Sequence, residues 1–237
     1  GEGSPSGAGT VFWKHPLEKY GHLTVDNSGS VSQGSSTPLR SVGRHEIKDV
    51  YQPVPGVWKI EVEGAPWVAT NGDLQYGIAG LEVDLDASEG GSDLYEIVSN
   101  TANVIELHSN NNLRGLIGNS LIGVQTFKTL HVLGGASLDI GEDRLEVLSV
   151  AGSSIAADAE LYLGEVTEDL ITLVGAEGGK LTIRNTSRLS DLNLQNLADG
   201  EVHFQDEVFL TSLGVSSGFV YFDKGLNVAE NLNISNG

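Results

Sequence analysis

The chain has no cysteine and no methionine, few basic residues and no long apolar run. Without cysteine, neither a disulfide nor a thiolate metal site can form. No apolar segment approaches the roughly 18 residues of a membrane span, and no signal-peptide pattern is present, so we expect no membrane insertion. Because methionine is missing even at position 1, we expect the chain to belong to a longer or processed polypeptide.

The scarcity of basic residues makes the chain strongly acidic. Its 13 Lys and Arg stand against 32 Asp and Glu, which gives a formal net charge of -19. Such a field repels phosphate backbones, and nucleic acid is therefore excluded as an expected partner. The acidic excess fits a solvated surface, with cation binding as the alternative.

The most informative feature is a repeat of apolar-x-apolar triplets in the C-terminal half. The stretch LHVLGGASLDI at 130–140 has two such triplets separated by glycine, and LGVSSGFVYF at 213–222 repeats the arrangement. Aligned on these stretches, the first triplets recur at intervals of 18, 23, 21, 21 and 19 residues. They fall at Leu130/Val132, Leu148/Val150, Ile171/Leu173, Leu192/Leu194, Leu213/Val215 and Leu232/Ile234.

Each first triplet is followed by a second, and a weaker third set completes the unit. Alternation at period two indicates strands with one buried face, and glycine suits the tight bends between them. Three short strands in about 20 residues, repeated in order, predict a solenoid whose coils stack in parallel. A leucine-rich repeat has a similar period, but its fixed Asn or Cys is missing. The second triplets are Leu138/Ile140, Ile155/Ala157, Leu181/Ile183, Val202/Phe204 and Val220/Phe222.

The predicted organisation has three parts. Residues 1–34 contribute an N-terminal coil and a polar loop, because GTVFWKHPLEKYGHLTVDN at 9–27 matches GFVYFDKGLNVAEN at 218–231. Residues 35–127 form an irregular β region, which we interpret as coils with long loops or, alternatively, as an inserted β subdomain. Residues 128–237 form the regular coils. No segment has a helical period, so the fold class is all-β.

The Leu-x-Val, Gly, Leu-x-Ile rhythm of residues 130–237 resembles the parallel β-helix repeats of large exported bacterial surface and adhesin-like proteins. Residues 7–29 are similar. The resemblance implies a right-handed parallel β-helix in a long exported polypeptide that functions in assembly or adhesion. The same fold also carries polysaccharide lyases and hydrolases, so the fold by itself does not decide the function.

Catalytic chemistry is not evident on the predicted outward positions. A β-helix enzyme acting on acidic polysaccharides needs carboxylates and an Arg or Lys base on neighbouring coils. The second outward column, however, contains neither two stacked carboxylates nor a base beside one, and we predict no catalytic residue. That column is Asp139, Ala156, Thr182, His203 and Tyr221.

Two other sites are candidates. Trp58, Trp67 and Tyr76 provide the best place for a ligand, since exposed aromatic rings stack on sugars, although burial in a core is the favoured alternative. Calcium is a candidate cofactor, because VDLDASEGGSD places several carboxylates together. Solvated charge is favoured there, since Glu89 stands where an EF-hand needs Gly. The acidic residues concerned are Asp84, Asp86, Glu89 and Asp93.

These observations favour a structural or adhesive β-helical module of an extracellular or cell-surface protein. Its expected partners are other copies or further domains of the same polypeptide, and cell-surface glycans. The alternative is a carbohydrate-active enzyme fragment, either a polysaccharide lyase or a hydrolase.

Overall fold

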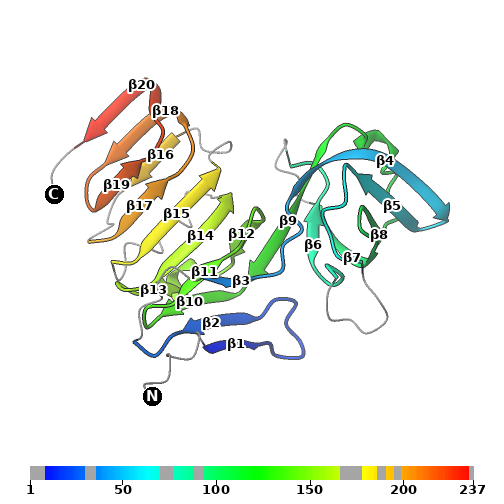
Figure 1. The fold of residues 1–237 in the computed structure, drawn as a ribbon, viewed down its shortest axis with the longest axis horizontal. Helices are drawn as coiled ribbons and strands as arrows, with labels where there is room; N and C mark the ends of the chain where they lie inside the picture. Colours follow the sequence, from blue (N-terminus) through cyan, green and yellow to red (C-terminus); the bar gives the residue numbers. More distant parts are fainter. Residues whose placement is uncertain are drawn as a thin grey trace, which may run out of the picture. The chain divides into compact units, whose positions relative to one another are not determined.

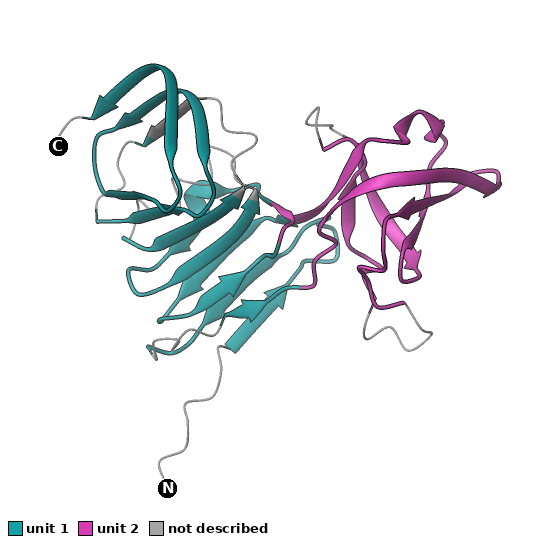
Figure 2. Cartoon of the chain, turned by 45° about the horizontal axis from the view of Figure 1, so that its top comes forward, with its two compact units in different colours: residues 1–39, 126–141, 145–237 teal, residues 40–125, 142–144 magenta. Residues whose placement is uncertain are grey.

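A computed structural model describes residues 9–29, 36–69, 77–87, 93–165, 178–185, 191–194 and 199–234. Strands make up 57% of the structure and helices 3%, which confirms the all-β class. No helix in the described ranges is both long and apolar enough to cross a membrane. The chain divides into two compact units, one of residues 1–39, 126–141 and 145–237 and the other of residues 40–125 and 142–144 (Figure 2).

The first unit is a β-solenoid of about four turns, whose coils stack strand on strand in parallel (Figure 1). One sheet consists of β1 (Gly9–Trp13), β2 (His22–Asp26), β10 (Thr129–Leu133) and β13 (Ser154–Ile155). A longer row consists of β3 (Thr37–Pro38), β11 (Ser137–Asp139), β14 (Glu160–Glu165), β15 (Lys180–Asn185), β17 (Glu201–Phe204) and β19 (Phe219–Phe222). A third sheet consists of β16 (Asp191–Leu194), β18 (Val208–Val215) and β20 (Leu226–Ile234).

Apolar side chains form ladders inside this unit, as the period-two alternation predicts. Leu138, Leu161, Leu181 and Val202 pair in register along the longer row, and each is fully buried. The predicted ladder is confirmed except at its second position. Ile155 does not join it, because Ile155 pairs with Val132 of β10 instead.

Two other sequence alignments are wrong. Leu148 and Val150 do not form a strand triplet, since Leu148 is 60% exposed and Val150 begins the short 3-10 helix η2 (Val150–Gly152). GTVFW is not a coil strand either, because β1 pairs antiparallel with β2 as a hairpin. The coil strand of the N-terminal segment is β2, which pairs in parallel with β10.

The first triplets fall in two different sheets. Leu192, Leu213 and Leu232 pair in register in the third sheet, as predicted. Leu130 and Val132 lie in the first sheet, where they pair with β2. The predicted triplet Ile171/Leu173 lies outside the described residues.

Close packing at one corner requires glycine. A Cβ on Gly179 would lie 2.5 Å from the backbone oxygen of Ile155, and backbone cannot give way as a flexible side chain can. Gly179 directly precedes β15, so the chain enters β15 in close contact with the end of β13.

The second unit is built differently, because its strands pair antiparallel. It has its own buried core, which includes Trp58 and Trp67. The described strands between residues 44 and 127 therefore do not continue the parallel coils, in contrast to the interpretation of 35–127 as coils with long loops. Its elements are β4 (Arg44–Val54), β5 (Val57–Val62), β6 (Glu82–Asp84), β7 (Leu94–Asn100), β8 (Val104–His108), η1 (Arg114–Leu116) and most of β9 (Ser120–Phe127); β12 (Arg144–Val147) begins in this unit.

Buried polar groups anchor residues 142–144 within the second unit. The Arg144 guanidinium donates to the Asp84 carboxylate at 2.8 Å, and both side chains are almost completely buried. Asp143 accepts hydrogen bonds from Ser41, Gly43 and Gln125. Burial raises the pKa of Asp143, and the hydrogen bonds that its carboxylate accepts act in the opposite direction. These hydrogen bonds offset part of the free-energy cost of burying the carboxylate.

Candidate functional site

The outer surface of the longer row in the first unit brings together ionisable and aromatic side chains from successive strands, and Asp139, Thr182, His203 and Tyr221 among them were predicted to point outward. Because the interior ladder takes the alternate positions, the residues between them face away from the core. Two adjacent columns result, which we call the outer face. One column is Asp139, Tyr162, Thr182, His203 and Tyr221; the other is Ser137, Glu160, Lys180, Glu201 and Phe219.

An arginine links three successive strands of the outer face. Arg184 of β15 donates two hydrogen bonds to the carboxylate of Asp139 on β11, at 2.8 and 2.9 Å. Its guanidinium lies over the ring of Tyr162 on the intervening strand β14, 5.3 Å from the ring centre. These bonds hold the pKa of Asp139 below its ordinary value, against the opposing effect of partial burial. The two hydrogen bonds between Arg184 and Asp139 therefore connect β15 to β11 across the intervening strand and stabilise the stacking of the coils.

Glu160 forms a second group of hydrogen bonds beside the first. It accepts from Lys180 at 2.7 Å and from Thr182 at 3.1 Å, and the Tyr162 hydroxyl donates to it as well. Burial acts to raise the pKa of Glu160, but these donors outweigh burial and hold the pKa below the ordinary value. Burial and the bond to Glu160 raise the pKa of Tyr162 to about 12, so its hydroxyl remains a donor.

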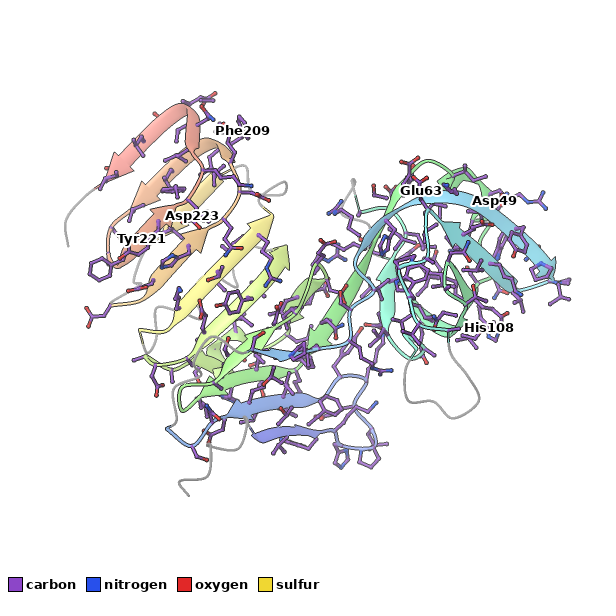
Figure 3. The ribbon with its side chains drawn as sticks, viewed as in Figure 1. Asp49, Glu63, His108, Phe209, Tyr221 and Asp223 are labelled. Carbon is purple, nitrogen blue, oxygen red and sulfur yellow. The ribbon has the colours of Figure 1, made fainter. Side chains whose placement is uncertain are left out.

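The β17 and β19 end of the outer face is more open and more aromatic. The His203 ring stacks on the Tyr221 ring, with centroids 4.3 Å apart and an angle of 23° between the planes. His203 Nε2 donates to Glu201 at 3.1 Å. Phe219 and Tyr221 are 53% and 41% exposed, and Figure 3 shows Tyr221 projecting away from the ribbon.

The structure corrects the outward column that the sequence predicted. Tyr162 occupies the position assigned to Ala156, because Leu161 and not Ile155 belongs to the interior ladder. With that register, carboxylates do lie beside bases, at Asp139 with Arg184 and at Glu160 with Lys180. A sequence signal was present, since a charged residue directly precedes the triplet in ELYL, KLTI and EVHF.

Comparison with known proteins does not assign the chain to a family. No protein family, no curated protein and no solved structure matches the chain. The function must therefore be argued from the residues themselves.

The two described aromatic residues that were predicted to bind a ligand, Trp58 and Trp67, are buried and not on the surface. Trp58 is 4% exposed and donates from its indole nitrogen to the carbonyl of Ser109, and Trp67 is 6% exposed and donates to the carbonyl of Val42. Both are core residues of the second unit. Tyr76 lies outside the described residues. Trp13, in the first unit, is the exposed one, with its ring stacked on His22.

The acidic stretch predicted as a calcium site is only partly described. Asp84 is buried and paired with Arg144, so its carboxylate already has a cationic partner. Asp93 is exposed, Asp86 is half-buried, and Glu89 lies outside the described residues. No group of three or more potential ligands is placed to hold a metal ion within the described ranges. Calcium binding stays a prediction.

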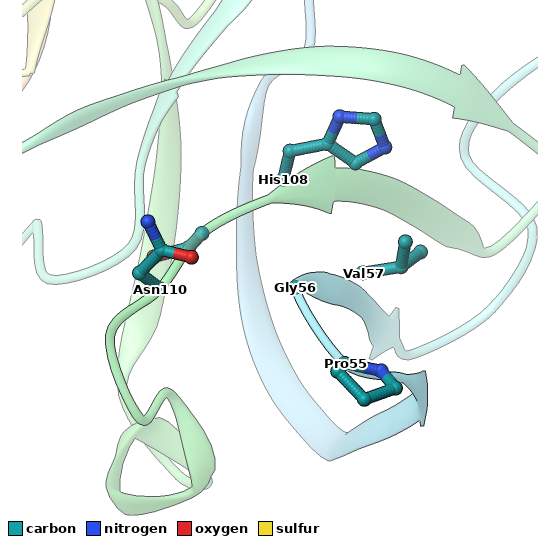
Figure 4. Close-up of a pocket in the computed structure, with 6 residues that line it drawn as sticks. Pro55, Gly56, Val57, His108 and Asn110 are labelled. Atoms are coloured by element: carbon teal, nitrogen blue, oxygen red, sulfur yellow. The ribbon is translucent and has the colours of Figure 1, made fainter.

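A pocket in the second unit is lined by few ionisable side chains. It lies where the β4–β5 turn meets the end of β8 (Figure 4). His108 is the one ionisable side chain among the residues that line it, and the others are Pro55, Gly56, Val57, Ser109 and Asn110. The outer face of the first unit is therefore the stronger candidate.

Proposed function

We propose that this chain is a structural and adhesive module of a long exported or cell-surface protein. In this proposal the first unit is a right-handed β-helix with three-stranded coils of about 20 residues, and it acts as a rigid support for a binding surface. Its partners are cell-surface glycans and other copies or further domains of the same polypeptide.

The observation that carries the proposal is the mutual pairing of charges on the outer face. A carboxylate that already accepts two or three hydrogen bonds, and whose pKa is lowered, is a poor general base because its affinity for a proton is reduced. The Asp139 and Glu160 groups fit that description. Such bonds between successive strands stiffen a surface, which suits a support and does not suit proton transfer.

The alternative is a carbohydrate-active enzyme, and one observation favours it. Carboxylates and bases lie side by side on the outward surface of neighbouring coils, at Asp139 with Arg184 and at Glu160 with Lys180. A lyase or hydrolase would use such a pair on a bound polysaccharide. Substrate would first have to displace the bidentate bonds of Arg184, which is why we place this function second.

An adhesion assay and a cleavage assay together separate the two functions. Beads coated with the full chain are incubated with intact bacterial and animal cells, before and after enzymatic removal of surface glycans, and beads coated with heat-unfolded chain are the control. We expect the folded chain to bind and glycan removal to reduce binding. In parallel, the chain is incubated with a panel of acidic polysaccharides. Release of shorter products without any cell binding would overturn the adhesive function in favour of the enzyme.

A further inference from the structure

The β17 and β19 end of the outer face has two aromatic side chains, Phe219 and Tyr221, that remain substantially exposed. On a sheet with one buried face, outward positions are normally polar, yet Phe219 faces outward and is 53% exposed. Tyr221 follows two residues later on the same strand and on the same side. At a rise of about 3.3 Å per residue, the two side chains leave the strand roughly 7 Å apart. Both rings are partly exposed to solvent, and the Tyr221 ring is stacked on His203 on one side.

Hydrogen-bonding groups lie directly beside these rings. Glu201 pairs in register with Phe219, and His203 pairs in register with Tyr221. Within the described part of the chain, the Tyr221 hydroxyl makes no hydrogen bond. Sugar rings have apolar C–H faces that stack on aromatic rings, and hydroxyl edges that bond to carboxylate, imidazole and phenol groups. This mixture of groups matches a sugar better than it matches an apolar peptide.

The charge around this end narrows the class of sugar. Glu201 lies on β17, Asp206 and Glu207 follow in the turn between β17 and β18, and Asp223 directly follows β19, whereas the basic residue Lys224 is bound to Asp206. The whole chain carries a net charge of -19. A polyanion such as a polyuronate or a sulfated glycan would be repelled, whereas an uncharged or amine-bearing glycan would not.

We propose that Glu201, His203, Phe219 and Tyr221, together the aromatic platform, bind glycans that carry no carboxylate or sulfate group. The platform takes sugar rings on Phe219 and Tyr221, while Glu201 and His203 bond to their hydroxyl or amino groups. This inference rests on the proposed adhesive function and names its ligand class. The platform differs from the β11–β15 part of the outer face, where Arg184 and Lys180 bind the carboxylates, because Glu201 is paired, among the described residues, only with His203, a neighbour within the platform itself.

Calorimetric titration of the full chain tests the ligand class. The probes are cellohexaose, which is uncharged, a glucosamine hexamer, which is cationic, and a galacturonic acid hexamer, which is anionic. We expect binding of at least one of the first two and none of the third. Tighter binding of the galacturonic acid hexamer, or no binding of any probe, would overturn the proposal.

Variants locate the site. Phe219→Ala and Tyr221→Ala should each weaken binding of the bound probe by roughly tenfold, as expected when a stacking ring is removed. Phe209→Ala is the matched control, because Phe209 is also an exposed phenylalanine, 63% exposed, but lies on β18 in another sheet (Figure 3). Unchanged affinity in both platform variants would place the ligand elsewhere and reject the platform.

The bead assay keeps this inference distinct from the proposed function. If coated beads bind cells and the platform variants bind equally well, the platform is wrong while the adhesive function stands. If oligosaccharide binding depends on Tyr221 but beads never bind cells, the platform stands and the adhesive function fails. If both platform variants instead abolish self-association of the chain and no oligosaccharide binds, the rings form an interface between copies, which contradicts the proposal.

Discussion

At the scale of single residues, the outer face has two parts that differ in their contacts. In the part formed by β11, β14 and β15 the carboxylates are paired with basic side chains, and in the part formed by β17 and β19 aromatic rings are exposed. Arg184 and Lys180 neutralise Asp139 and Glu160 within the surface, whereas Tyr221 and Phe219 remain exposed. A side chain engaged by several partners contributes to stability, and one that exposes a ring is available to a ligand. In our proposal the same sheet therefore contributes to stability at one end and to ligand binding at the other.

The first prediction concerns the pH dependence of stability that Asp139 and Glu160 cause. The pKa values of Asp139 and Glu160 are lowered by folding from ordinary values of 3.8 and 4.5. A carboxyl whose pKa is lower in the folded state stabilises it fully above its ordinary pKa and loses that contribution as pH falls through the folded value. Urea unfolding followed by circular dichroism should thus show the midpoint falling below about pH 4.5.

The variant Asp139→Asn should flatten that dependence, because residue 139 then carries no titratable group. Asp223→Asn, which changes an exposed carboxyl at the end of β19, is the control and should keep the slope of the parent chain. Parallel curves for Asp139→Asn and the parent chain would show that the Arg184 bond does not contribute to the pH dependence.

At the scale of elements, the interior ladder and the corner glycines set the spacing of the coils. The ladder through β11, β14, β15 and β17 is fully buried, so each strand depends on its neighbours above and below. Gly179 allows the chain just before β15 to pass the end of β13 without a clash at Ile155. Stability of the first unit is thus a sum of contacts between adjacent coils.

The second prediction concerns that ladder. Leu181→Ala in a middle coil should reduce the free energy of unfolding by about 2 to 5 kcal/mol, through lost burial and an unfilled cavity. Asp223→Ala should stay within about 0.5 kcal/mol of the parent chain, because Asp223 is exposed. Asp139 is unsuitable as the exterior control, since it bonds to Arg184. Equal losses from Leu181→Ala and Asp223→Ala in chemical denaturation would refute the assignment of interior and exterior positions.

At the scale of the whole molecule, the C-terminal end of the solenoid exposes residues that continue interior ladders. Leu232 and Ile234 of β20 pair with Leu213 and Val215, yet they are 56% and 68% exposed. Among the described residues, β20 has a strand neighbour only on the side of β18. Unpaired backbone groups and open apolar side chains on an edge strand favour the addition of another strand.

The third prediction follows from that edge. We expect the chain to self-associate reversibly as its concentration rises, with the β20 edge as the contact. Leu232→Lys should weaken the association, because a buried ammonium at the contact is costly. Leu148→Lys, which changes an exposed leucine away from that edge, is the control. Sedimentation velocity measures both, and a strict monomer at high concentration would contradict the prediction.

The sequence by itself determined the features that depend on local alternation. Period two indicates which face of a strand is buried, and repetition of the triplets indicates stacking, so the all-β solenoid and most of its interior could be predicted. Ladder positions such as Leu181 and Val202 were identified because each lies in a clear triplet near a glycine. These properties need no knowledge of which strand pairs with which.

Only the tertiary structure decided which strands pair and which side chains meet. SSIAA and ELYL both offer apolar alternation within one coil, and the choice between them depends on contacts with neighbouring coils that local pattern does not contain. Asp139 and Arg184 lie 45 residues apart in the chain, and they meet only when β14 occupies the position between their strands. The antiparallel pairing of residues 40–125 likewise depends on distant strands. A candidate site whose residues come from several coils therefore depends on the register between strands. The alternation of apolar and polar residues within one strand does not determine that register.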